Sequence, residues 1–144
     1  MNFSLQLQPV ERALTLHRPW AGLILHHDKT AENRSWAPPR TPLRIAVHAG
    51  RTVDREAVAA LTRGRFELPD YLLTEGLVGT VLITSAHQAT ACPGGAGCQQ
   101  WGVLTGWHWT LADPRPLTTP VPARGLQKLW RLDPDQIRPL EVEM

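Results

Sequence analysis

The chain has 144 residues, of which 42% are hydrophobic and 19% charged, as expected for one globular domain with its own core. It contains no apolar run of membrane-spanning length and opens without a basic and apolar leader, so we expect a cytoplasmic protein with no contact to membranes. The net charge of +2 is too small to mark a nucleic-acid-binding protein by itself, and two cysteines exclude a disulfide framework.

The charge is unevenly distributed along the chain. Residues 1–65 contain ten Lys or Arg against five Asp or Glu, whereas residues 66–144 contain five against eight. The first part therefore carries +5 and the second −3. This asymmetry predicts a basic face that attracts phosphate groups, and the alternative is ordinary solvated surface charge with no partner.

The first half of the chain predicts strands around one helix. Apolar and polar residues alternate over 13–17, which predicts a short strand. Pro19 can occupy a first helical turn, and apolar residues follow it at spacings of three and four, so a helix is expected over about 18–28. Residues 30–36 precede a proline pair and are expected to be extended, and 43–50 alternate as a strand.

The second half predicts one more helix and then strands. Thr52 is a plausible N-cap for a helix over 52–65, which has acidic residues in its first turn. A long buried strand is expected over 77–87, with Gly79 as a candidate bulge. Further strands are expected over 107–117 and 128–132. The order of these helices and strands indicates an α+β domain, most simply a small, partly closed barrel with helices outside. Pattern alone does not separate a barrel from a sandwich.

Residues 26–40, HHDKTAENRSWAPPR, concentrate polar chemistry in a short stretch. If the segment is extended, Glu32, Arg34 and Trp36 face the same side, and the long stem of Lys29 reaches that surface. The guanidinium suits a phosphate or a base edge, the indole suits stacking, and the carboxylate can orient the lysine, pair with the arginine or accept from a ligand's amino group. The alternative is an ordinary salt bridge with the tryptophan covering the core.

The segment LTLHRPWAGLILHHDKTAENRSW resembles the opening of the activating signal cointegrator homology (ASCH) domain, a branch of the PUA-like superfamily. The family signature is Gly-x-Lys-x-x-Glu-x-Arg after a short helix, and its charged positions match Lys29, Glu32 and Arg34. The glycine is not retained, and we take Asp28, at the corner before the lysine, as its replacement. Aspartate tolerates a positive φ there, but its carboxylate would compete with a phosphate for the ammonium group. The segments LRIAVHAG and ARGLQKLWRL also resemble family strands, so the likeness spans 14–133 of a single domain over 1–144.

The resemblance implies a PUA-like β-barrel of five or six strands flanked by helices, with a basic cleft around the signature that binds RNA or single-stranded DNA. The residues expected at this interface are Lys29, Glu32, Arg34, Trp36, His48, Arg51, Arg124 and Lys128. Arg124 and Lys128 extend the basic rim in this interpretation, or else only keep an edge strand soluble.

The resemblance also implies an alternative, a ribonuclease or a hydrolase acting on a modified nucleoside. Lys29, Glu32 and His48 are the candidate catalytic residues in that case. A hydrolase branch of the family has threonine where this chain has Glu32, which argues against the same mechanism. A half-buried, structurally satisfied His48 is an equal interpretation. A small-molecule sensor or protein-interaction domain is a third function compatible with the fold.

No metal site or cofactor is expected. Among six histidines, the neighbours His26 and His27 point about 100° apart on a helix. Cys92 and Cys98 are separated by five residues, unlike the tight Cys-x2-Cys knuckle of structural zinc sites. The sequence therefore favours solvated or packed histidines and a flexible, glycine-rich loop.

Overall fold

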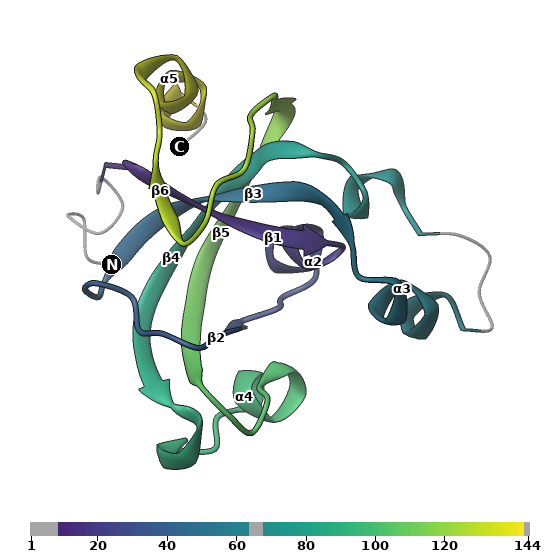
Figure 1. Cartoon of the computed structure of the whole chain (residues 1–144), viewed down its shortest axis with the longest axis vertical. Coiled ribbons are helices and arrows are strands. Elements are labelled where there is room, and N and C mark those ends of the chain that lie inside the picture. Colours follow the sequence, from purple (N-terminus) through teal and green to yellow (C-terminus); the bar gives the residue numbers. More distant parts are fainter. Residues whose placement is uncertain (1–8, 64–67, 143–144) are drawn as a thin grey trace.

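The computed structural model describes residues 9–63 and 68–142 (Figure 1). Their strands are β1 (Arg12–Arg18), β2 (Ala31–Arg34), β3 (Leu43–Val53), β4 (Gly76–Gln88), β5 (Trp107–Val121) and β6 (Leu129–Arg131). The helices are α2 (Trp20–His26), α3 (Arg55–Thr62), α4 (Ala96–Trp101) and α5 (Pro134–Val142), with 3₁₀ turns η1 (Asp70–Leu72) and η2 (Ala89–Ala91). This confirms the expected α+β class.

The strands form one six-stranded mixed sheet in the order β2-β5-β4-β3-β1-β6. β1 runs parallel to β3, and the other pairs are antiparallel. The long strands β4 and β5 curve strongly, and β1 crosses in front of them (Figure 1). Within the described ranges β2 and β6 remain edges, so the sheet has the expected number of strands but does not close into a full barrel.

Alternating side chains divide the core between the two faces of the sheet. Leu14, Ile45 and Val47 belong to the cluster that packs against α2. Ala13 and Ala46, their neighbours in the chain, belong to a second cluster with residues from α5. This is the period of two expected of strands that are covered on both sides.

The structure corrects the predicted start of the second helix. Thr52 belongs to β3, and the N-cap of α3 is Asp54, whose Oδ1 accepts from the Ala57 amide at 3.0 Å. Aspartate is at least as good an N-cap as threonine, and the β3 pattern simply continues further than the alternation suggested. The predicted end near Gly64 lies outside the described residues.

The bulge predicted in β4 is confirmed. The register of β4 with both neighbouring strands shifts beside Gly79. A Cβ at this position would lie 2.6 Å from the Arg115 carbonyl oxygen and 2.8 Å from the Leu25 side chain, so only glycine fits without movement. The acidic C-terminal segment, for which no element was predicted, forms α5. No helix in the described ranges is long and apolar enough to cross a membrane.

Candidate nucleic-acid-binding site

The corner between α2 and β2 places the signature lysine. Asp28 has φ of 55°, a left-handed conformation that aspartate tolerates better than most residues. The expectation that Asp28 replaces the signature glycine is corrected: two positions before Lys29 stands His27, whose φ is −133°, and the left-handed residue is the next one along. Asp28 is exposed, and the lysine ammonium bonds to other groups, so the expected competition by this carboxylate is not seen.

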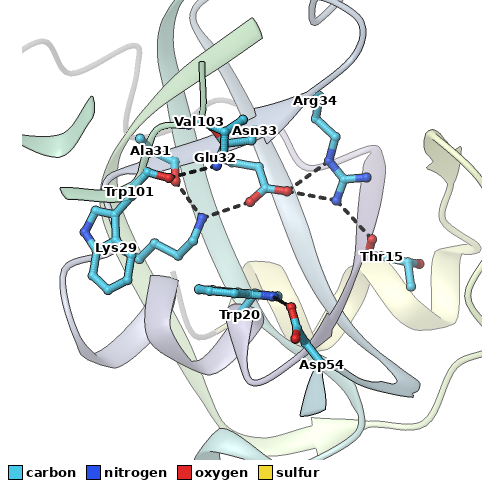
Figure 2. Close-up of polar contacts among 10 residues, drawn as sticks. All are labelled: Thr15, Trp20, Lys29, Ala31, Glu32, Asn33, Arg34, Asp54, Trp101 and Val103. Atoms are coloured by element: carbon cyan, nitrogen blue, oxygen red, sulfur yellow. Dashed lines mark hydrogen bonds and ion pairs between the residues drawn. The ribbon is translucent and has the colours of Figure 1, made fainter. Parts of the chain in front are cut away.

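Glu32 lies between two cations on β2 (Figure 2). Its Oε1 accepts from Lys29 Nζ at 2.9 Å, and its Oε2 accepts from Arg34 Nε at 2.9 Å. The side chains of Lys29 and Glu32 are 3% and 9% exposed, whereas Arg34 is 25% exposed. The period of two in β2 therefore places the carboxylate and the guanidinium on one side, as predicted.

The lysine retains hydrogen-bonding capacity. Its ammonium group has three N–H donors, of which one goes to Glu32 and one to the Ala31 carbonyl oxygen at 2.6 Å. No further partner of Nζ exists among the described residues. The ammonium lies 5.5 Å from the ring centroid of Trp20. A buried ammonium group with an unused N–H can donate a hydrogen bond to an oxygen atom of a ligand.

The Trp20 ring is itself held in place. Its Nε1 donates to Asp54 Oδ2 at 2.9 Å, the carboxylate that also caps α3 (Figure 2). The hydrogen bonds from the Ala57 amide and from this indole lower the pKa of Asp54. Asp54 therefore stays ionised, and the indole keeps its orientation.

These groups line a cleft of about 550 Å³, which we call the Lys-Glu-Arg cleft. Its wall includes Thr15, Trp20, Lys29, Glu32, Arg34 and Trp101. The sequence did not identify the contribution of the end of α4 and the residues that follow it. Asn33 binds this segment, because its Nδ2 donates to the Trp101 carbonyl oxygen and its Oδ1 accepts from the Val103 amide, both at 2.9 Å. This contact brings a second indole to the cleft.

Trp36 lies outside this cleft wall. β2 ends at Arg34, so the predicted shared face does not extend to the tryptophan. Trp36 packs edge-on against Trp109 with ring centroids 4.9 Å apart, and Lys128 Nζ lies 5.9 Å from its centroid. The structure thus places Trp36 and Lys128 beside each other, and Trp20 and Trp101 take the position beside the charges.

His48, Arg51 and Arg124 line a second hollow of about 800 Å³, which we call the His48 hollow. Thr15 lines both hollows. Six of the eight predicted interface residues are therefore divided between two neighbouring concave surfaces, and Trp36 and Lys128 line neither of them. The His48 hollow also contains Glu75, which pairs with Arg18 at 3.2 Å.

His48 has both ring nitrogens occupied. Its Nε2 lies 2.8 Å from the Ala123 carbonyl oxygen, which can only accept, so Nε2 carries the proton. Its Nδ1 then accepts from the Thr15 hydroxyl at 3.1 Å, and this hydroxyl accepts from Trp130 Nε1 at 3.0 Å. Burial lowers the pKa of His48, which favours the neutral ring. These contacts are those of a histidine that joins β3 to the segment after β5.

The sequence matches no protein-family model, and no curated protein matches it. Solved structures do match. A crystal structure of ASCH from Zymomonas mobilis aligns with a TM-score of 0.54 and 16% identity, covering 90% of this chain and 92% of that one. A tyrosine-to-phenylalanine variant of that protein aligns with a TM-score of 0.53 and 14% identity, covering 88% and 93%. The chain therefore has the fold of the ASCH domain, as the resemblance implied.

Proposed function

We propose that this chain is a nucleic-acid-binding module that takes one unpaired nucleotide of RNA or single-stranded DNA into the Lys-Glu-Arg cleft. The observation that carries the proposal is the row of buried Lys29, buried Glu32 and partly exposed Arg34 on the wall of a hollow of about 550 Å³ with two indole rings. A hollow of this size suits a single base and its sugar, and unpaired bases are what proteins read by stacking and by hydrogen bonds to their edges.

The chemistry of the wall suits a base that has both oxygen and amino groups. The unused N–H of Lys29 donates to a base carbonyl or a phosphate oxygen. Oε2 of Glu32 contacts both Nε and Nη2 of Arg34, but Oε1 contacts only Lys29 and has a second lone pair, which can accept from an exocyclic amino group. Trp20 and Trp101 supply the apolar and aromatic surface on which a base stacks.

The His48 hollow gives the rest of the strand a path. Thr15 lines both hollows, so a strand with one base beside Lys29 can continue across β1. Arg51 and Arg124 are exposed on the second hollow and would contact phosphate groups there. The charge of +5 over residues 1–65 supports this attraction.

The test is a titration of labelled single-stranded RNA, single-stranded DNA and duplex with the wild type, Lys29→Met and Arg34→Ala at low and physiological salt. Arg138→Ala is the charge-matched control, because Arg138 is exposed on α5. We expect single strands to bind in a salt-dependent way and both cleft variants to bind at least about tenfold more weakly than the control. Equal affinity of all four proteins, or no binding at low salt, would contradict the proposal.

The second candidate function is hydrolysis at the same cleft, by a ribonuclease or by a hydrolase of a modified nucleoside. The hydrogen-bonded pair of Lys29 and Glu32 at 2.9 Å favours it, because such a pair can hold and move a proton beside a bound substrate. His48 does not line this cleft, so the lysine and the carboxylate would act without it. Product formation that disappears in both Lys29→Met and Glu32→Gln would support an enzyme, and intact RNA and nucleosides would support a reader.

A further inference from the structure

A group of two cysteines and two histidines lies at the end of the β4–β5 pair, apart from the charge row. One ligand atom from each of His87, Cys92, Cys98 and His108 lies within 4.8 Å of all the others. We propose that these four residues form a structural Zn²⁺ site that fastens the segment between β4 and β5 onto the sheet. Sets of two thiolates and two imidazoles in a closed arrangement are typical of structural zinc sites.

The distances fit the edges of a zinc tetrahedron. With usual zinc–ligand lengths, two nitrogens lie about 3.3 Å apart, a sulfur and a nitrogen about 3.6 Å, and two sulfurs about 3.8 Å. His87 Nε2 and His108 Nδ1 are 3.2 Å apart, and Cys98 Sγ lies 3.5 Å from His87 Nε2. The widest separation of 4.8 Å closes to a tetrahedral edge with a shift of about 1 Å.

The outer contacts also suit a metal ion. His108 Nε2 lies 2.6 Å from the Val103 carbonyl oxygen, which can only accept, so this nitrogen carries the proton and Nδ1 presents a lone pair to the cluster. Histidine ligands of metals commonly donate their other N–H to a backbone carbonyl in this way. The Gly94 amide donates to Cys92 Sγ at 3.4 Å, a contact that stabilises a thiolate.

The fold supplies the four ligands from separate elements. His87 and His108 are directly opposite each other in the register of β4 with β5, which brings the two rings together. Cys98 lies in α4, and Cys92 follows η2. Because the ligands come from two strands and the loop between them, an ion would cross-link the loop to the sheet.

This segment has little apolar core of its own. Between residues 89 and 106 the only buried hydrophobic side chain is that of Cys98, at 9% exposure. A segment that buries so little apolar area gains little stability from the hydrophobic effect, and a metal ion substitutes for a core in such cases. The same segment contributes Trp101 to the Lys-Glu-Arg cleft, so the ion would also hold one wall of that cleft.

The first test is metal content. We expect the wild type, purified under reducing conditions after expression with zinc, to contain about one zinc per chain, and Cys98→Ser and His87→Ala to lose it. His26→Ala is the matched control, because His26 is an exposed histidine of α2 outside the cluster, and it should keep the metal. Zinc retained equally by Cys98→Ser, His87→Ala and His26→Ala would overturn the assignment of these ligands.

The second test needs no substitution and no nucleic acid, so it is independent of the proposed function. Metal-free, reduced wild type is titrated with Co²⁺, and we expect the intense visible bands of a tetrahedral ion together with thiolate-to-cobalt charge transfer. Zinc should displace the cobalt and raise the melting temperature. A colourless protein with both thiols free, or one whose mass shows a disulfide between Cys92 and Cys98, would overturn the proposal.

Discussion

Two carboxylates in this molecule each lie between two cations, but their surroundings differ. Glu32 of β2 is held by the cations of the signature. Asp113 of β5 pairs with Arg44 at 2.5 Å and with Arg115 at 3.0 Å. Both clusters contain a nearly inaccessible cation, since Arg44 is 0% exposed and Lys29 is 3% exposed.

The cluster around Asp113 is structural, whereas the cluster around Glu32 is a candidate binding site. Arg44 comes from a central strand, donates to Thr80 Oγ1 at 3.0 Å as well as to Asp113, and lines neither of the two hollows described above. Lys29 lines the cleft and has an N–H without a protein partner among the described residues. Burial of a charge pair is therefore not itself a sign of function. What distinguishes the cluster of Lys29, Glu32 and Arg34 is the adjoining cleft and the unused N–H donor of the lysine.

The largest expected effect is on stability at the structural cluster. Arg44→Ala removes a fully buried side chain and its bonds, so we expect the free energy of unfolding to fall by about 3 kcal/mol. RNA affinity of the folded fraction should not change. Urea denaturation measures the first quantity and a titration the second. A specific loss of RNA affinity in Arg44→Ala would erase the distinction between the clusters.

Lys29→Met should affect RNA affinity more than stability. The variant loses two hydrogen bonds of a charged group but keeps an apolar side chain of similar length, so we expect a loss of about 1–2 kcal/mol in the free energy of unfolding. RNA affinity should fall at least about tenfold. The same two measurements apply, and a variant as unstable as Arg44→Ala with normal affinity would make Lys29 a structural residue.

Substitutions in the His48 hollow should weaken single-strand binding less, and less specifically, than substitutions in the Lys-Glu-Arg cleft. Arg51→Ala and Arg124→Ala each remove an exposed cation, so we expect a few-fold loss of affinity for every single strand. Each change should reduce the slope of log affinity against log salt by about 1. Titrations over a series of salt concentrations test this. Unchanged slopes would confine binding to the Lys-Glu-Arg cleft.

The smallest expected effect is the dependence of stability on pH at His48. Because burial lowers its pKa in the folded protein, the unfolded chain binds the proton first as the pH falls. The contribution of His48 is therefore fully present above about pH 6.5 and decreases as the pH falls from there through the folded pKa. His48→Gln should show a smaller decrease than the wild type in urea denaturation over this range. An equal decrease in both proteins would assign the effect to other groups.

The sequence by itself determined the local parts of this molecule. Alternation and helical spacing identified β1, α2 and β3, since those patterns reflect which side of one element is buried. The common face of Glu32 and Arg34 was predictable for the same reason, because a strand with a period of two involves only neighbouring residues.

Only the tertiary structure decided which distant segments meet. The register of β4 with β5 brings His87 to His108 beside the cysteines, whereas the sequence spacing directed attention to the histidines of α2 and argued against a metal. The bond from Asn33 to the Trp101 carbonyl likewise joins residues far apart in the chain. Such contacts depend on strand pairing and loop docking, which residue spacing does not specify. They form the wall of the Lys-Glu-Arg cleft and bring together the ligands of the proposed zinc site.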